Sequence, residues 1–270
     1  MKDLVVVTGL GGMGSACARR LAQGRSLALL DLDAAKLARV ADELTRAGCD
    51  VDTTVADVAD PAAMHAFAAR VAASGTIRAL VHTAGISGSM GSSERILAVN
   101  LLGTANAIDA FEPLMAPGSA AVMIASMGSI SVPIDPEVER RLAHAPAGEL
   151  VGIVQAIRRF ATVEAYCVSK RAVQLRVYAA SLRWGRRGVR INTISPGIIA
   201  TPMGELEARN VPAMAVMRQI SPIQRIGQPE DIAAAAEFLL GPNASFVTGT
   251  DLAVDGGVIA ATVWGDVKAF

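Results

Sequence analysis

The chain has 270 residues, of which 52% are hydrophobic, enough to bury a large core in one sizeable α/β domain. Its 25 basic and 25 acidic residues give a formal net charge of zero. This balance, with no long run of Lys or Arg, excludes the basic footprint of proteins that bind nucleic acids or anionic membranes. We therefore expect a small neutral molecule as the substrate.

The first residues lack the apolar core and cleavage site of a signal peptide, and no apolar stretch reaches the roughly 18 residues of a membrane span. We therefore expect a cytoplasmic protein. Cys17, Cys49 and Cys167 show no metal-ligand spacing. We expect these cysteines to be reduced and buried, and we expect no metal site.

Strand and helix patterns alternate along the chain. An apolar run at 4–7 leads into a glycine turn at 8–14 and a helical pattern at 15–22, and further strands are expected at 27–30, 51–55, 79–82, 120–125, 189–194 and 251–254. Helices are expected at 34–47, around 95–114, and at 162–184 and 231–240. Together these elements predict one α/β domain over residues 1–270, a Rossmann-type, doubly wound parallel sheet of about seven strands with helices on both faces.

The glycine turn carries a dinucleotide-binding pattern. Gly9, Gly11 and Gly14 are spaced so that the chain can turn tightly and approach a pyrophosphate resting on the helix N-terminus. The alternative, a glycine turn that serves only helix packing, is less consistent with its place between a strand and a helix. Asp31 ends the second strand and suits the ribose hydroxyls of NAD. No Arg or Lys in the turn or directly after Asp31 would balance the 2′-phosphate of NADP, so we expect NAD to be preferred.

Tyr166 and Lys170 lie four residues apart, which in a helix places the phenol and the ammonium on one face. A fixed lysine charge within roughly 4 to 6 Å favours the phenolate of a tyrosine. The spacing therefore predicts a tyrosine that moves protons near pH 7, although an exposed Tyr–Lys pair shows the same spacing.

Further motifs make the resemblance to one family specific. The chain resembles the short-chain dehydrogenase/reductase family over nearly its full length, through the turn at 8–14, Asp57-Val58, residues 82–85, Asn100, Ser126, the Tyr166–Lys170 pair, and the segments 192–202, 225–233 and 254–257. The resemblance implies a catalytic group of Asn100, Ser126, Tyr166 and Lys170. It also implies cofactor contacts from Gly9, Gly11, Gly12, Met13, Gly14, Asp31, Asp57, Val58, Ala84, Gly85, Tyr166, Lys170, Pro196, Gly197, Ile199 and Thr201.

The implied roles divide the chemistry between the chain and its cofactor. Ser126 would bind the substrate oxygen, and Tyr166 would take or give the hydroxyl proton. Lys170 would lower the pKa of Tyr166 and hold the nicotinamide ribose, and Asn100 would keep a water-linked proton path open behind Lys170. The resemblance thus implies an NAD-dependent oxidoreductase that interconverts a secondary alcohol and a ketone, with an apolar substrate of which a steroid is one example. A dinucleotide sensor without turnover, or an epimerase or dehydratase on the same scaffold, is the alternative.

Three features depart from the family pattern. The glycine turn is one residue shorter than usual, and His82 and Thr83 stand where the family has two asparagines. We expect these two side chains to tie neighbouring strands together rather than to bind a ligand. The stretch between Ser126 and Tyr166 is longer than usual, so residues 131–163 form a helical insertion that acts as a lid, as an interface or as a packed surface elaboration.

The insertion resembles that of the bacterial 3α-hydroxysteroid dehydrogenase/carbonyl reductase subgroup, in which added helices alter subunit contacts. The resemblance implies a homodimer or a homotetramer. Residues 203–219 lie where the family has its mobile substrate-binding loop. Their methionines suit either an adaptable apolar pocket or ordinary helix packing.

Overall fold

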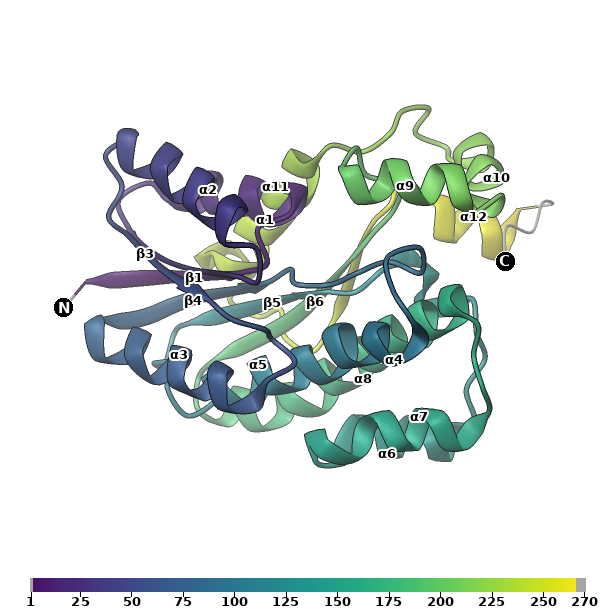
Figure 1. Cartoon of the computed structure of the whole chain (residues 1–270), viewed down its shortest axis with the longest axis horizontal. Coiled ribbons are helices and arrows are strands. Elements are labelled where there is room, and N and C mark those ends of the chain that lie inside the picture. Colours follow the sequence, from purple (N-terminus) through teal and green to yellow (C-terminus); the bar gives the residue numbers. More distant parts are fainter. Residues whose placement is uncertain (1, 266–270) are drawn as a thin grey trace.

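A computed structural model describes residues 2–265. Seven parallel strands form one sheet in the order β3-β2-β1-β4-β5-β6-β7 (Figure 1). This confirms the predicted Rossmann-type sheet. The strands are β1 (Asp3–Thr8), β2 (Ser26–Asp31), β3 (Val51–Val55), β4 (Thr76–His82), β5 (Ala120–Ile124), β6 (Arg190–Pro196) and β7 (Asp251–Val254).

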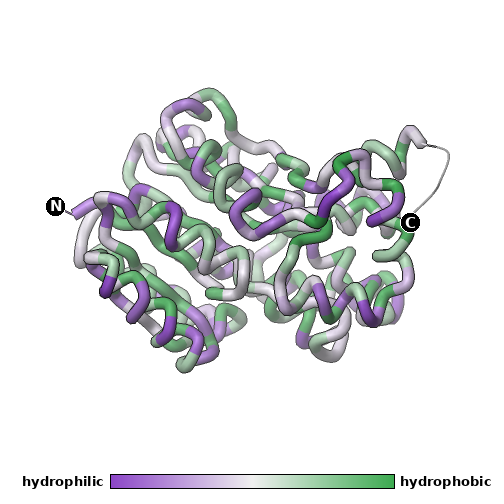
Figure 2. The backbone as a smooth tube through the Cα atoms, turned by 90° about the horizontal axis from the view of Figure 1, so that it is seen from above, coloured by the Kyte–Doolittle hydropathy of each residue, from purple (hydrophilic) through white to green (hydrophobic). Residues whose placement is uncertain are grey.

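Helices cover both faces of the sheet (Figure 1). One face packs against α1 (Gly12–Leu21), α2 (Ala34–Arg46) and α11 (Pro229–Leu240). The other face packs against α3 (Pro61–Ser74), α5 (Gly103–Phe111) and α8 (Thr162–Arg186). In Figure 2 hydrophilic and hydrophobic residues alternate along the helical turns of the chain, as is usual when one side of a helix meets a sheet.

The apolar run of β1 explains why the sheet is buried on both faces. Val5 and Val7 pack among residues of α1 and α2, whereas Leu4 and Val6 pack among residues of α3 and α5. Side chains of a strand point alternately to opposite faces, so a strand covered on both sides needs apolar residues at every position. Each such side chain contributes roughly 1.5–3 kcal/mol by its burial.

Two helices lie in stretches for which no element was predicted. The first is α3, which carries a clear start signal: Asp60 accepts hydrogen bonds from Ala62 N and Ala63 N, and Pro61 occupies the first helical position. The second is α12 (Val258–Trp264). The helix predicted around 95–114 is confirmed as one continuous helical stretch, in which α4 (Ser93–Ile96) runs into a π-helical turn, η1 (Leu97–Leu102), and then into α5.

Residues 131–163 contain α6 (Pro136–His144), η3 (Ala147–Glu149) and α7 (Leu150–Ile157), after a short 3₁₀ turn, η2 (Met127–Ile130). Helices α6 and α7 lie beside α8 (Figure 1), and their apolar residues Leu142, Leu150 and Val154 form a buried cluster with α8 and η1. Arg171 of α8 donates to Glu139 at 2.7 Å. The two helices therefore cover the outer side of α8.

Two further helices, α9 (Pro202–Asn210) and α10 (Ala213–Ile220), occupy most of the predicted substrate-binding loop. They lie with α12 at the end of the sheet opposite the N-terminus (Figure 1). Met217 of α10, Val258 of α12 and Met127 form a small buried cluster there. Across residues 2–265 no helix combines the length and the apolar character needed to cross a membrane.

Candidate active site

Two adjoining cavities open where the strands end. The larger, of about 410 Å³, is lined by the glycine turn and the ends of β2 and β4, and the smaller, of about 140 Å³, by residues of β5, α8, α9 and α10. Met13, Gly85 and Thr201 line both cavities. Every residue expected to contact the cofactor lines one of them. In a parallel sheet the carboxyl ends of the strands meet at one edge, which is why motifs far apart in sequence converge here.

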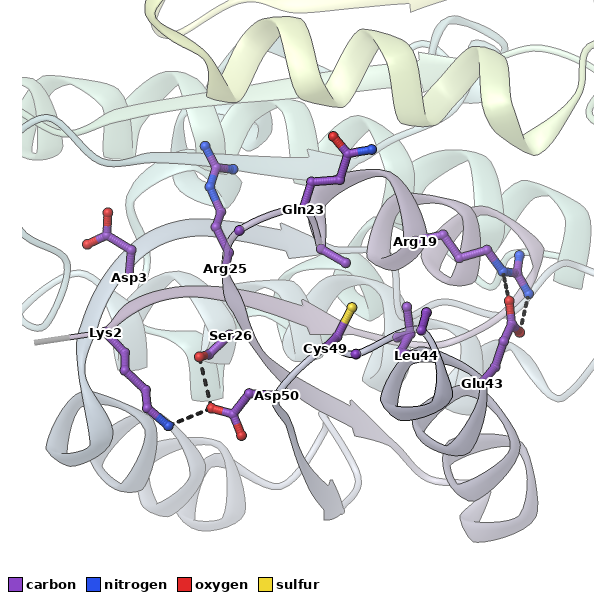
Figure 3. Close-up of a pocket in the computed structure, with 14 residues that line it drawn as sticks. Lys2, Asp3, Arg19, Gln23, Arg25, Ser26, Glu43, Leu44, Cys49 and Asp50 are labelled. Atoms are coloured by element: carbon purple, nitrogen blue, oxygen red, sulfur yellow. Dashed lines mark hydrogen bonds and ion pairs between the residues drawn. The ribbon is translucent and has the colours of Figure 1, made fainter.

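A third pocket, of about 630 Å³, lies at the opposite edge of the sheet (Figure 3). Two ion pairs join residues that line it: Lys2 pairs with Asp50 at 2.7 Å, and Arg19 pairs with Glu43 at 2.6 Å. None of the predicted site residues lines it. Its size alone is therefore no argument for function.

The glycines of the turn differ in whether the surrounding structure leaves room for a side chain. Gly9 has a φ of +85°, and a Cβ there would lie 2.4 Å from Ala84 N. A Cβ on Gly14 would lie 1.9 Å from the Gly9 carbonyl oxygen, so packing alone requires both glycines. Gly11, by contrast, has open space around its Cβ position and caps α1 without a side-chain hydrogen bond. The first N–H groups of α1 can therefore receive a phosphate.

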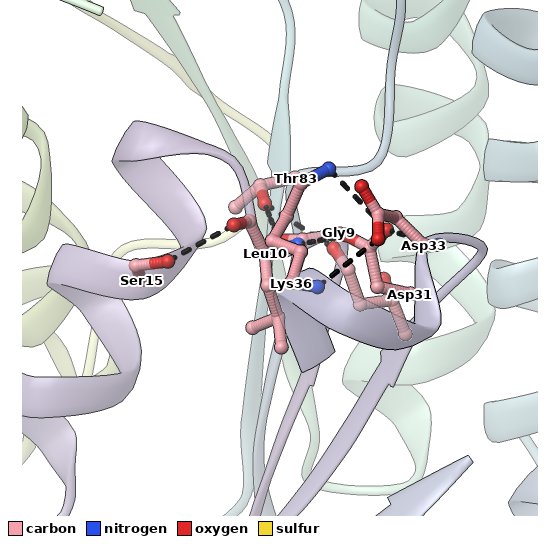
Figure 4. A network of polar contacts seen from close by, with 8 residues as sticks. Gly9, Leu10, Ser15, Asp31, Asp33, Lys36 and Thr83 are labelled. Atoms are coloured by element: carbon pink, nitrogen blue, oxygen red, sulfur yellow. Dashed lines mark hydrogen bonds and ion pairs between the residues drawn. The ribbon is translucent and has the colours of Figure 1, made fainter. Parts of the chain in front are cut away.

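Asp31 is fixed beside this turn (Figure 4). The Asp31 residue is 7% exposed, and its carboxylate oxygens accept hydrogen bonds from Leu10 N at 2.5 Å and from Asp33 N at 2.9 Å. Lys36 Nζ lies 3.4 Å from Asp31 Oδ1 and lines the same cavity. The sequence showed no basic residue directly after Asp31, but the first turn of α2 brings a lysine to it, so the charge argument against NADP is weaker than predicted.

A second ion pair borders the larger cavity. Arg95 Nη2 lies 2.8 Å from Asp57 Oδ2, and both side chains line the cavity with Val58. Asp57 was expected here, whereas Arg95 was missed. Arg95 follows a serine N-cap at the start of α4, which gives no sign of a ligand contact.

Ser126, Tyr166 and Lys170 converge on the smaller cavity. Ser126 caps η2 by accepting from Gly128 N at 3.1 Å, and its hydroxyl also hydrogen-bonds the Tyr166 hydroxyl. Lys170, one turn further along α8, donates from Nζ to the Ile124 carbonyl at 2.8 Å. The Lys170 ammonium nitrogen is 5.9 Å from the centre of the Tyr166 ring.

Burial shifts the pKa values of this pair in opposite directions. Burial raises the pKa of Tyr166 to about 12, against the lowering effect of the Ser126 hydrogen bond, and nearby Cys167 and Glu207 raise it further. Burial lowers the pKa of Lys170 to about 8. The predicted phenolate near pH 7 therefore does not form in this state of the protein. Desolvation penalises either charge and so shifts both groups toward their neutral forms, but a pKa of about 8 still leaves most of Lys170 protonated at pH 7.

Asn100 lies behind the cavity rather than in its wall. Its Oδ1 accepts from Ile86 N at 2.9 Å, and its Nδ2 donates to the Ile86 carbonyl at 2.9 Å and to Ser169 Oγ at 3.1 Å. A Cβ on Gly85 would lie 3.2 Å from Asn100 Oδ1 and 3.3 Å from Lys170 Nζ, so both side chains approach the backbone of Gly85. The π-helical turn η1 carries Asn100, and such turns often occur at functional sites.

His82 and Thr83 contact β1. The His82 Nδ1 lies 2.7 Å from Thr8 Oγ1, and Thr83 Oγ1 donates to the Gly9 carbonyl at 2.5 Å. Burial, with a contribution from the Lys170 charge, lowers the pKa of His82 to about 3, so its ring is neutral. These contacts agree with the expected strand-tying role.

The cysteines form no disulfide bond in the part of the chain that the structure describes. All three cysteines are free thiols, with Cys17 and Cys167 buried and Cys49 half-buried. Burial was therefore predicted correctly for two of them. No cluster of three or more His, Cys, Asp or Glu residues could hold a metal ion among residues 2–265.

Comparison with known proteins adds to this geometry. Residues 3–134 match the family model described as short chain dehydrogenase, and residues 136–259 match the model described as enoyl-(acyl carrier protein) reductase. The chain is 36% identical to the short-chain dehydrogenase/reductase bsc3 of Alternaria brassicicola, over 96% of each chain. The chain belongs to the short-chain dehydrogenase/reductase family. It is accordingly an oxidoreductase that acts on CH–OH groups.

Other members of the short-chain dehydrogenase/reductase family show a range of substrates. The galactitol 2-dehydrogenase (L-tagatose-forming) of Cereibacter sphaeroides is 38% identical, over 96% of this chain and 94% of the relative. A short-chain dehydrogenase from Burkholderia cenocepacia in complex with NADP superposes with a TM-score of 0.76 and 26% identity, covering 95% and 97% of the two chains. A 7α-hydroxysteroid dehydrogenase complexed with NADH and 7-oxo glycochenodeoxycholic acid has a TM-score of 0.74 and 26% identity, covering 94% and 93%. The resemblance to the 3α-hydroxysteroid dehydrogenase/carbonyl reductase subgroup stays an expectation.

Proposed function

We propose that this protein is an NAD-dependent oxidoreductase that interconverts a secondary alcohol and a ketone on a neutral, largely apolar substrate. The observation that carries the proposal is the convergence of Ser126, Tyr166 and Lys170 on a cavity that adjoins the larger, dinucleotide-sized one. When bound, the nicotinamide cofactor supplies or accepts the hydride. The side chains of the protein orient the substrate against the cofactor and supply a proton.

Each catalytic residue has a role that fits its contacts. Tyr166 holds its proton at neutral pH and gives it to the carbonyl oxygen during reduction, while Ser126 hydrogen-bonds the same oxygen. Lys170 would hold the nicotinamide ribose. Asn100, which approaches Gly85 together with Lys170, keeps the proton path open behind that lysine.

The cofactor would lie across both cavities. The glycine turn and the N-terminus of α1 would hold the pyrophosphate, Asp31 the adenosine ribose, and Asp57-Val58 the adenine. Ile199 and Thr201 would meet the nicotinamide carboxamide. The remaining contacts would come from Ala84, Gly85, Pro196 and Gly197, all of which line these cavities.

The preference for NAD is tested with two opposite substitutions. Asp31→Asn keeps a hydrogen-bond acceptor near Leu10 N and removes the charge, so the ratio of kcat/KM for NADH over NADPH should fall at least roughly tenfold. Lys36→Met removes the positive charge 3.4 Å from Asp31 and should raise the same ratio. If both variants kept the wild-type ratio, the Asp31–Lys36 pair would not select the cofactor.

The high pKa of Tyr166 sets the direction of the pH dependence. A raised pKa favours the phenol, which reduction needs, and makes the phenolate scarce, which oxidation needs. The kcat/KM for alcohol oxidation should therefore rise about tenfold per pH unit between about pH 7 and 9, while that for ketone reduction stays flat there. An oxidation profile already level at pH 7 would contradict a neutral Tyr166.

The size of the smaller cavity favours small substrates. Its volume of about 140 Å³ lies below the roughly 300–1,000 Å³ of sites for drug-sized ligands, so a small alicyclic alcohol fits better than a steroid. Purified protein with NADH and cyclohexanone, followed by absorbance at 340 nm, should show turnover. Turnover confined to bulky steroid ketones would instead mean that α9 and α10 open widely.

We also propose that the protein is a cytoplasmic homodimer or homotetramer. The outer side of α8 is covered by α6 and α7 through Leu142, Leu150 and Val154, so this face is closed to a second subunit. The dimer is therefore the better supported of the two states. Light scattering on the purified protein distinguishes the two masses.

A further inference from the structure

The smaller cavity carries one carboxylate in an otherwise largely apolar wall. The apolar residues that line it include Met127, Val163, Val211, Met214 and Met217. Among the described residues that line this cavity, Glu207 of α9 is the one acidic side chain and Lys170 the one basic side chain. None of the roles assigned above uses Glu207.

Glu207 makes a hydrogen bond through one of its two carboxylate oxygens. Its Oε1 accepts a hydrogen bond from Ser89 N at 3.2 Å, which links α9 to the loop after β4 on the other side of the cavity. Within residues 2–265 the structure gives Oε2 no hydrogen bond and gives the side chain no ion pair. Glu205 on the same helix differs, because it is largely exposed and lies 3.9 Å from Arg209.

The carboxylate is near the reacting group. After burial, which is the largest cause, the charge of Glu207 contributes to the raised pKa of Tyr166 and also to that of Cys167. Tyr166 meets the substrate oxygen in the proposed reaction. A substrate bound there therefore comes close to Glu207 as well.

A substrate that displaces water from a carboxylate must donate a hydrogen bond in place of the one that water donated. Leaving the free oxygen without a donor is unfavourable, whereas a hydroxyl of the substrate would satisfy it. A substrate carboxylate would be repelled by like charge. An ammonium group would meet the charge of Lys170 in the same small cavity, so a neutral hydroxyl fits best.

We propose that Glu207 determines substrate specificity by accepting, through Oε2, a hydrogen bond from a second hydroxyl of the substrate. The preferred substrates are then neutral diols and hydroxyketones rather than simple alcohols or hydroxy acids. This inference rests on the proposed function, since it names the substrate class of the same site.

The test compares cyclohexanol with the 1,2-, 1,3- and 1,4-cyclohexanediols, using NAD and the wild-type protein, Glu207→Gln and Glu205→Gln. Wild type should prefer the best diol over cyclohexanol by roughly tenfold or more in kcat/KM, the worth of a hydrogen bond to a charged acceptor. Glu207→Gln keeps an acceptor for Ser89 N but loses the charge, so this ratio should fall about tenfold. Glu205→Gln should keep the wild-type ratio.

Two outcomes would separate the inference from the function on which it rests. Equal diol-to-cyclohexanol ratios in wild type and Glu207→Gln would overturn the role of Glu207 and leave the proposed function standing. No NAD-coupled turnover of any of these alcohols by wild type would overturn both. As a second readout, removal of the Glu207 charge should move the pH profile of alcohol oxidation to lower pH, and an unmoved profile would also count against the inference.

Discussion

Replacement of Tyr166 by phenylalanine should lower kcat for ketone reduction by roughly 10²- to 10⁴-fold, the usual contribution of a positioned general acid. The ring keeps its half-buried position, so only the proton donor and its hydrogen bond to Ser126 are lost. Binding of NADH should stay within about twofold of wild type because the phenol oxygen does not hold the adenine, the pyrophosphate or the adenosine ribose. Steady-state kinetics and a fluorescence titration with NADH measure the two effects.

Tyr178 provides the matched control, because it is the only other tyrosine in the chain and lies on the same helix, α8. It lines neither cavity. Tyr178→Phe should keep wild-type kcat. If both variants turned over ketone at the wild-type rate, Tyr166 would not be the proton donor.

Replacement of Asn100 by alanine should lower the free energy of unfolding by about 2–4 kcal/mol, the cost of leaving the backbone N–H and C=O of Ile86 without partners. A loss of this size corresponds to a fall of roughly 5–15 °C in the melting temperature for a chain of this length. Loss of the Ser169 contact adds to the effect. Thermal and denaturant unfolding followed by circular dichroism measure the change.

Asn106 provides a comparison for which a smaller loss of stability is expected. Its side chain is also buried, but it makes a single hydrogen bond, from Nδ2 to the Val58 carbonyl at 3.0 Å. Asn106→Ala should therefore cost about 1 kcal/mol, less than Asn100→Ala. An Asn100→Ala variant as stable as wild type would show that Ile86 finds water instead, and that Asn100 does not hold the loop beside Gly85.

The fold was predictable because its main signals are local. Apolar runs that end in turn residues, with helical patterns between them, define a parallel α/β sheet without knowledge of any contact. The main omission, α3, was also recoverable, since Asp60 and Pro61 mark its start. The π-helical turn between α4 and α5 was not, because the apolar pattern of the helix runs through it without a break.

The site was predictable in its residues but less so in its electrostatics. The spacing of Tyr166 and Lys170 gave the pair, but the direction of the pKa shift depends on burial by distant segments, which no spacing reveals. Lys36 reaches Asp31 because it lies in the first turn of α2, which begins shortly after β2 ends. Glu207 meets Ser89 across a contact between residues far apart in sequence, so its place in the cavity could not be read from the chain.

The most direct test of the central claim is transfer of deuterium from NADH deuterated at both C4 positions to a ketone such as cyclohexanone, followed by mass spectrometry of the product. An NAD-dependent alcohol–ketone oxidoreductase should deliver one deuterium to the carbinol carbon in each turnover, and Tyr166→Phe should slow the appearance of this product. Binding of NADH without any labelled alcohol, across a panel of small cyclic and open-chain ketones and hydroxyketones, would contradict the claim and favour a protein that senses the dinucleotide.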